Sequence, residues 1–191
     1  MRNTGYIRWP GLKYFLFEYE KQLLCESKEE DARITYFDYL EATVEHIIPV
    51  QYADYWNPTV EAFLECVSTN EEEKQLARRV LINTLGNLTI LRHGKNSSLG
   101  NKPWIEKKAR FRTGSYNEIE VSDYHRWQEE KVLGMQATTL DSEWDKDTIK
   151  ERGEKMIKLL FKKLGCTYPS ESIVRQMLFS SEDLYLKAFN N

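Results

Sequence analysis

The chain has 191 residues, of which 41% are hydrophobic and 30% are charged, and its net charge is −3. This balance is typical of a folded globular protein, so it excludes an intrinsically disordered chain and a generic polycation that coats nucleic acid. The length predicts a single domain that spans residues 1–191.

We expect neither a membrane segment nor an export signal. No apolar run approaches the roughly 20 residues of a membrane helix, and the polar residues 1–10 contain no signal-peptide core. The three cysteines are far apart in the sequence, which argues against a disulfide framework and against a CxxC zinc site. These features predict a cytoplasmic protein that does not contact a membrane.

The predicted secondary structure alternates two short strands with many helices. Apolar residues at helical spacing predict a first helix within 10–26, and the following segment suits either an extended chain or a short helix and a strand. The run from Val44 to Pro49 predicts a strand that stops at Pro49, because proline cannot donate to a ladder. The remaining predictions are a second strand at 88–91 and helices at 58–67, 70–81, 104–111, 122–136, 144–164, 169–178 and 181–189.

The predicted fold class is therefore α+β and predominantly helical. Its core comprises the two strands and the helix after them, at about residues 43–110, with a helical insert at 57–82 between the strands. Helical flanks are expected at 10–26 and 122–189, and they have to support the strands because two strands alone are marginally stable.

Glu45 and His46 lie near the end of the first predicted strand. Histidine titrates near neutral pH and can take a proton from water, and an adjacent carboxylate can bind a divalent cation through oxygen. These are two components of phosphodiester hydrolysis. Neighbours on a regular strand point to opposite faces, so a shared site requires the strand to twist or end between them. Taken alone, the pair is also a common dipeptide without a function.

Two later runs, Leu85–Leu91 and Lys95–Lys102, contain further candidates. Asn87 in the first can hydrogen-bond to backbone groups through its amide, and asparagine oxygens in the second are neutral ligands suited to Mg²⁺. In isolation, the first run is an ordinary turn before a strand and the second is an ordinary helix cap. Their order after Glu45 and His46 is more specific than any one of them.

Positive charge is concentrated in one stretch of this acidic chain. Between Arg92 and Arg112 there are seven basic residues and one acidic residue, which gives a local net charge of +6. One basic face on an acidic body suits a phosphate ligand. A solvated helix face explains the same charge equally well.

Together, these runs resemble the HNH family of one-metal nucleases, whose ββα-metal core is a hairpin followed by a helix. The resemblance rests on Glu-His-Ile-Ile-Pro at 45–49, Gly-Asn-Leu-Thr at 86–89 and Asn-Ser-Ser-Leu-Gly-Asn-Lys-Pro-Trp at 96–104. Their flanks look like the nuclease domain of GmrSD-type modification-dependent restriction enzymes. The helices at 13–16 and 144–162 extend this similarity over most of the chain.

The resemblance implies a metal-dependent DNA endonuclease, and it implies a role for each matching residue. His46 matches the general base, and Asn87 matches the residue that orders the loop and orients that base. Glu45 and Asn96 match the ligands of Mg²⁺ or Mn²⁺, with Asn101 as a competing ligand, and no zinc is expected. The residues expected to contact DNA are Arg92, Lys95, Asn101, Lys102, Lys107 and Lys108.

The resemblance also suggests a partner. Full-length members of the family join this domain to an NTP-hydrolysing or modification-sensing part, and this sequence has no P-loop motif. We therefore expect either a nuclease subunit that acts with a separate ATPase, GTPase or modification-sensing subunit, or a stand-alone effector, in a bacterial restriction or anti-phage defence system. Two alternatives stay open, namely an inactive nucleic-acid-binding or subunit-interaction module and an HNH enzyme that cleaves RNA.

Overall fold

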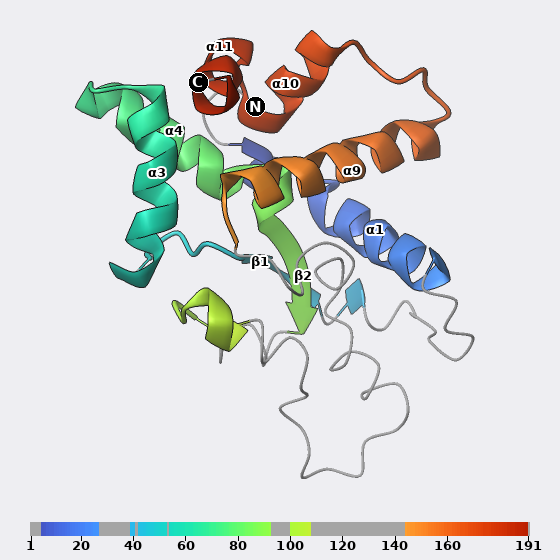
Figure 1. Ribbon diagram of the computed structural model, residues 1–191. Helices are drawn as coiled ribbons and strands as arrows, with labels where there is room; N and C mark the ends of the chain where they lie inside the picture. The colour runs from blue at the N-terminus through green and yellow to red at the C-terminus, as the bar shows by residue number, and fades with distance from the viewer. Residues whose placement is uncertain are drawn as a thin grey trace, which may run out of the picture.

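A two-stranded antiparallel sheet lies among helices in the computed structural model (Figure 1). Strand β1, Ala42–His46, pairs with strand β2, Leu88–Arg92. The register places Glu45 opposite Thr89. The structure describes residues 5–26, 39–40, 42–52, 54–92, 100–107 and 144–190.

The sequence predicted that the first strand stops at Pro49, but strand β1 ends earlier, at His46. The main chain of Asn87, the residue just before β2, still pairs with Ile47, but the Asn87 side chain replaces the backbone as the partner of Ile48. The amide of Ile47 donates to the main-chain oxygen of Asn87 at 3.0 Å, and the amide of Ile48 donates to the side-chain oxygen of Asn87 at 2.9 Å. The chain therefore leaves the ladder before the proline is reached.

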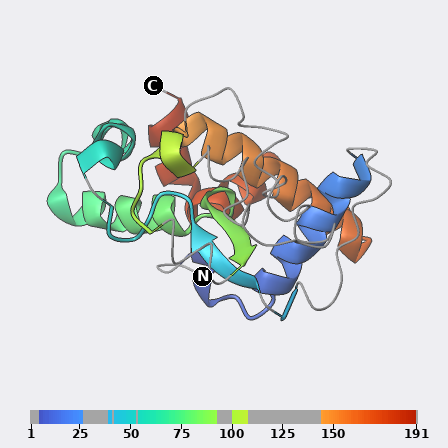
Figure 2. The same cartoon turned by 90° about the horizontal axis from the view of Figure 1, so that it is seen from below.

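The helical insert predicted between the strands is confirmed. Helix α4 begins where Asn70 accepts hydrogen bonds from the amides of Glu72 and Glu73, and acidic residues occupy its first turn. Figures 1 and 2 show α3 and α4 on one side of the hairpin and α1 on the other. The elements of the insert are η2 at Asp54–Trp56, α3 at Asn57–Val67, α4 at Glu71–Asn83 and η3 at Leu85–Asn87.

The helical flanks close the core around the hairpin. Helix α9 begins where Asp145 accepts from the amide of Thr148, and it ends at Gly165, whose φ of 63° is the left-handed conformation that glycine favours. Helix α9 packs against η3 and α10, while α11 packs against α3. The bounds are η1 Gly5–Arg8, α1 Leu12–Glu26, α9 Lys146–Leu164, α10 Glu171–Phe179 and α11 Glu182–Phe189.

The predicted α+β class and the predominance of helices are confirmed. The predicted helices at 144–164, 169–178 and 181–189 correspond to α9, α10 and α11. The helix expected at 104–111 is described over 104–107, and the one expected at 122–136 lies outside the described residues. Among the helices that the structure describes, none is long and apolar enough to cross a membrane.

Gly86 lies where η3 touches helix α9. A Cβ atom added to Gly86 would stand 1.9 Å from the main-chain oxygen of Ile149, which the helix holds in place. We therefore expect Gly86→Ala to lower the free energy of unfolding by about 3 kcal/mol, the upper end of ordinary overpacking costs. Urea unfolding followed by circular dichroism measures this change.

Gly153→Ala at the same contact is the matched control. Its added Cβ would meet the Cδ2 atom of Leu178 at 2.6 Å, and this side chain can move. Alanine also favours the helix by about 1 kcal/mol relative to glycine, so the net change should be small. Equal losses in the two variants would contradict the role given to the close backbone approach at Gly86.

Candidate active site

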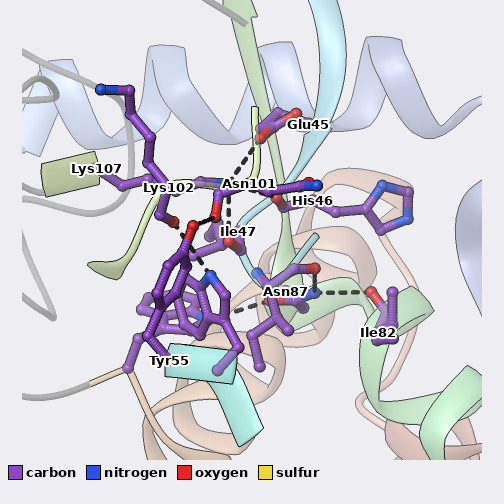
Figure 3. Close-up of polar contacts among 12 residues, drawn as sticks. Glu45, His46, Ile47, Tyr55, Ile82, Asn87, Asn101, Lys102 and Lys107 are labelled. Atoms are coloured by element: carbon purple, nitrogen blue, oxygen red, sulfur yellow. Dashed lines mark hydrogen bonds and ion pairs between the residues drawn. The ribbon is translucent and has the colours of Figure 1, made fainter. Parts of the chain in front are cut away.

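Glu45 and His46 lie at the end of β1 and have different partners. The carboxylate of Glu45 contacts Lys107, from a short helix at 104–107, whereas the ring of His46 contacts Asn83 at the end of α4. Figure 3 shows the ring of His46 turned away from Lys107. This divergence is expected of neighbouring residues on a strand. The two candidates are therefore adjacent in sequence but are oriented by different elements.

Asn83 orients the imidazole of His46. Nε2 of His46 lies 3.0 Å from Oδ1 of Asn83, and Nδ2 of Asn83 donates to the main-chain oxygen of Arg79 at 2.8 Å. Because the amide nitrogen of Asn83 already donates, its oxygen is the acceptor, and Nε2 of His46 carries the hydrogen. Nδ1 is then the ring nitrogen that accepts a proton.

The surroundings of His46 favour its neutral form. Burial lowers the pKa of His46, the hydrogen bond with Asn83 opposes this change, and the positive charge of Lys107 adds to it. The resulting pKa lies below the ordinary histidine value, so the ring is neutral at neutral pH. A neutral imidazole with an unprotonated Nδ1 has the state that a general base requires.

Asn83 is a site residue that the sequence reasoning missed. It lies in the last turn of α4, and 37 positions separate it from His46. An asparagine near a helix end has many ordinary roles, so its residue type gave no signal for this one. The contact exists because the insert returns the chain to the end of β1.

We expect Asn83→Leu to reduce kcat for phosphodiester cleavage by about 10²-fold, since a misplaced base loses its alignment with the attacking water. The pKa of His46 should fall further, because the hydrogen bond that raises this pKa is gone. In a plot of rate against pH, the rate rises as His46 loses its proton. This rise, the acidic limb of the profile, should therefore move to lower pH. A pH–rate profile measures both effects.

Asn190→Leu serves as the control for this prediction, because Asn190 ends helix α11 and makes no contact with His46. It should leave both kcat and the acidic limb unchanged. An unaltered profile in Asn83→Leu, or a limb that moves to higher pH, would contradict the orienting role of Asn83.

Asn87 joins three parts of the chain through a buried side chain. Its Oδ1 accepts from the amide of Ile48 at 2.9 Å and from Nε1 of Trp144 at 3.1 Å. Its Nδ2 donates to the main-chain oxygens of Ile48 at 3.1 Å and Ile82 at 2.8 Å. These contacts fix the loop that follows His46, which agrees with the ordering role expected of Asn87. A direct part in catalysis stays a prediction.

Lys107 does not occupy the exposed position expected of a phosphate-binding lysine. Its side chain is 0% exposed, and Nζ donates to Oε1 of Glu45 at 2.9 Å and to the main-chain oxygens of His46 at 3.2 Å and Ile47 at 3.0 Å. Burial raises the pKa of Glu45 and lowers the pKa of Lys107, and their mutual attraction opposes both changes. The ammonium group of Lys107 therefore bonds to protein oxygens in the interior and is not accessible to solvent or to a phosphate.

Asn101 and Lys102 lie beside this centre at the surface. The hydroxyl of Tyr55 donates to the main-chain oxygen of Asn101 at 2.6 Å, and Nε1 of Trp56 donates to that of Lys102 at 3.1 Å (Figure 3). The side chain of Asn101 is exposed, and Nζ of Lys102 pairs with Glu106 at 2.9 Å. Both side chains are placed where a ligand can reach them.

The remaining predicted residues are not placed by the structure. Lys95, Asn96 and Lys108 lie outside the described residues. The backbone of Arg92 pairs with Ala42 at the end of the hairpin, and its side chain is likewise outside the description.

The oxygen donors of the predicted ligands fit a hard divalent cation. Oε1 of Glu45 accepts a hydrogen bond from Lys107, and the carboxylate has further lone pairs with which it could bind a metal. The other predicted ligand is Asn96, and within the described ranges no three His, Cys, Asp or Glu side chains form a metal-binding group. Oxygen from a carboxylate and an amide suits Mg²⁺ or Mn²⁺, which retain several water ligands in such sites.

Arg152 is a second residue that the sequence did not reveal. It is fully buried in α9, and its Nη1 donates to the main-chain oxygens of Gly86 at 2.7 Å and Leu88 at 2.8 Å. These two oxygens lie on either side of Asn87 in the sequence. Arg152 of helix α9 therefore fixes the backbone of Asn87, and Trp144, which lies just before that helix, fixes its side chain.

Comparison with known proteins identifies one family. The family described as GmrSD restriction endonucleases, C-terminal domain, matches residues 2–159. This match includes the hairpin, the helical insert and most of α9. No curated protein and no solved structure matches the chain significantly.

Proposed function

Because the chain belongs to the family of GmrSD restriction endonuclease C-terminal domains, we propose that it is a metal-dependent HNH endonuclease that hydrolyses DNA. The family indicates a nuclease of the restriction type. The proposal adds that β1, β2 and the helix described at 104–107 form a ββα-metal core. It also adds a role in bacterial defence.

The observation that carries the proposal is the state of His46. Asn83 fixes its Nε2–H, burial keeps the ring neutral, and Nδ1 is the nitrogen that accepts a proton. In the proposed reaction, Nδ1 of His46 takes a proton from the water that attacks phosphorus. Asn87 keeps the loop after His46 in place during this step.

The proposed metal site uses one residue of strand β1 and one residue that follows the hairpin in the sequence. Glu45 and Asn96 would hold Mg²⁺ or Mn²⁺, which when bound neutralises charge that develops on the phosphate and on the leaving oxygen. The residues proposed to seat the DNA backbone are Arg92, Lys95, Asn101, Lys102 and Lys108. Lys107 is not among them because its side chain is buried.

We propose that target choice comes from a partner. Contacts with the phosphate backbone carry no sequence information, so a basic surface alone cannot select a site. A separate ATPase, GTPase or modification-sensing subunit would supply that choice, and the two would act in the cytoplasm. Co-purification with such a subunit tests this part, and selective cleavage of modified DNA by the chain alone would contradict it.

The test of the proposed activity is cleavage of supercoiled plasmid by the purified chain with Mg²⁺ or Mn²⁺. We expect nicked or linear plasmid, inhibition by EDTA, and no product from His46→Ala purified in parallel. Plasmid DNA, DNA with modified bases and single-stranded RNA are compared as substrates. Cleavage of RNA alone would replace DNA as the substrate, and no cleavage of any substrate together with DNA binding would indicate an inactive binding module.

A further inference from the structure

Lys107 is the one described lysine whose side chain is fully buried. Its ammonium group has three N–H donors, and the structure supplies three oxygen acceptors, from Glu45, His46 and Ile47. An unpaired ammonium in the interior is strongly unfavourable, so this complete set of acceptors is what allows the charge to be buried. All three acceptors lie in consecutive residues at the end of β1.

We propose that Lys107 is a positioning residue of the nuclease site, whose ammonium group holds the Glu45 carboxylate and the backbone around His46 in their working geometry. The three acceptors belong to Glu45, His46 and Ile47, so they include the residues before and after His46. The contacts therefore limit movement of the backbone that carries the His46 ring. The hydrogen bond from Lys107 fixes one carboxylate oxygen of Glu45, and this limits rotation of the carboxylate.

The position of Lys107 itself is fixed independently. The segment that leads to it is held by Tyr55 and Trp56, which donate to the main-chain oxygens of Asn101 and Lys102. The ring of Trp104 packs against that of Trp144, with centroids 5.1 Å apart. Lys107 therefore connects an anchored segment to the end of β1, 62 positions earlier in the chain.

A simple contribution to stability does not account for this arrangement. A buried ion pair is often no more stabilising than apolar side chains of similar volume, because both charges lose their hydration. A phosphate contact does not account for it either, since Lys107 is 0% exposed and its donors are already used. The contacts instead converge on the two residues proposed to carry the chemistry.

The inference rests on the proposed function, and Lys107→Met tests it in the full chain. We expect kcat for plasmid cleavage to fall by about 10²-fold, as for a misplaced catalytic group, with KM and the Kd for DNA unchanged. Lys102→Met is the matched comparison at the surface, and it should instead raise KM and weaken the salt dependence of DNA binding. Unchanged kcat in folded Lys107→Met, or a raised Kd for DNA, overturns the inference.

A measurement on the wild-type chain covers the case in which Lys107→Met does not fold. Isotope labelling of the lysine Nζ atoms makes a slowly exchanging ammonium visible by NMR, and burial assigns this signal to Lys107. We expect Mn²⁺ to broaden it before the signals of exposed lysines, because the ion and Lys107 share Glu45. A Lys107 signal that persists while Mn²⁺ supports cleavage overturns the inference, whereas absence of both Mn²⁺ binding and cleavage overturns the proposed function.

Discussion

His46→Ala should abolish detectable plasmid cleavage, with a loss in kcat of about 10²- to 10⁴-fold, the range attributed to general acid–base catalysis. No other described histidine lies near the end of β1, so no neighbouring imidazole within the described ranges replaces it. The effect should be on kcat and not on the Kd for DNA, because the proposed role of His46 is proton transfer and not phosphate binding. Single-turnover cleavage and DNA binding, measured on the same preparation, separate the two.

The loss of activity in His46→Ala should not reflect unfolding. The substitution removes one hydrogen bond, with Asn83, which contributes about 1 kcal/mol to stability. Addition of free imidazole should restore part of the rate. Lys163→Ala, which removes an exposed ion pair with Glu18, is the control for an alanine substitution away from the candidate site. It should keep the full rate. Cleavage by His46→Ala at the rate of the wild type would exclude His46 as the base.

Asn87→Ala should cause a large loss of stability. We expect the free energy of unfolding to fall by about 4 kcal/mol, since each buried group left without a partner costs about 1–3 kcal/mol and partial relaxation recovers some of it. The groups that lose their partner are the amide and oxygen of Ile48, the oxygen of Ile82 and Nε1 of Trp144. Urea unfolding measures this change.

Asn190→Ala is the matched control for Asn87→Ala, since it removes the same side chain at the end of α11. It should change stability by less than about 0.5 kcal/mol, as is usual for surface positions. Tryptophan fluorescence adds a local readout, because Trp144 loses its hydrogen-bond acceptor only in the Asn87 variant. A loss in Asn87→Ala no larger than that of the control would contradict the joining role of this side chain.

The hairpin and the helical insert could be predicted from the sequence because their signals are local. Prolines, an asparagine cap and acidic first turns indicate where helices begin, and the short run at 88–91 predicts the second strand. The end of β1 could not be predicted in this way. It is determined by hydrogen bonds that the amides of Ile47 and Ile48 donate to Asn87, which lies far away in the sequence.

Motif order singled out Glu45, His46 and Asn87 as candidates, whereas the residues that contact them in the structure were not predicted. Asn83 contacts His46 only after the insert has folded, and the contacts of Arg152 depend on the packing of α9 against η3. The charge of Lys107 suggested a phosphate contact because sequence shows the charge of a side chain but not its burial. Residue type identifies groups able to perform chemistry, while tertiary packing decides which of their neighbours orient them.

The order of the elements along the chain determines when the site can be completed during synthesis. His46 is made well before Trp144, which precedes α9, and Arg152 in the middle of α9, and these two residues hold Asn87. The hairpin also has to close a long loop, which has an entropic cost and slows folding. A nascent chain in which α9 is still inside the ribosome therefore lacks the contacts that hold Asn87, and the proposed activity could begin only after α9 has left it.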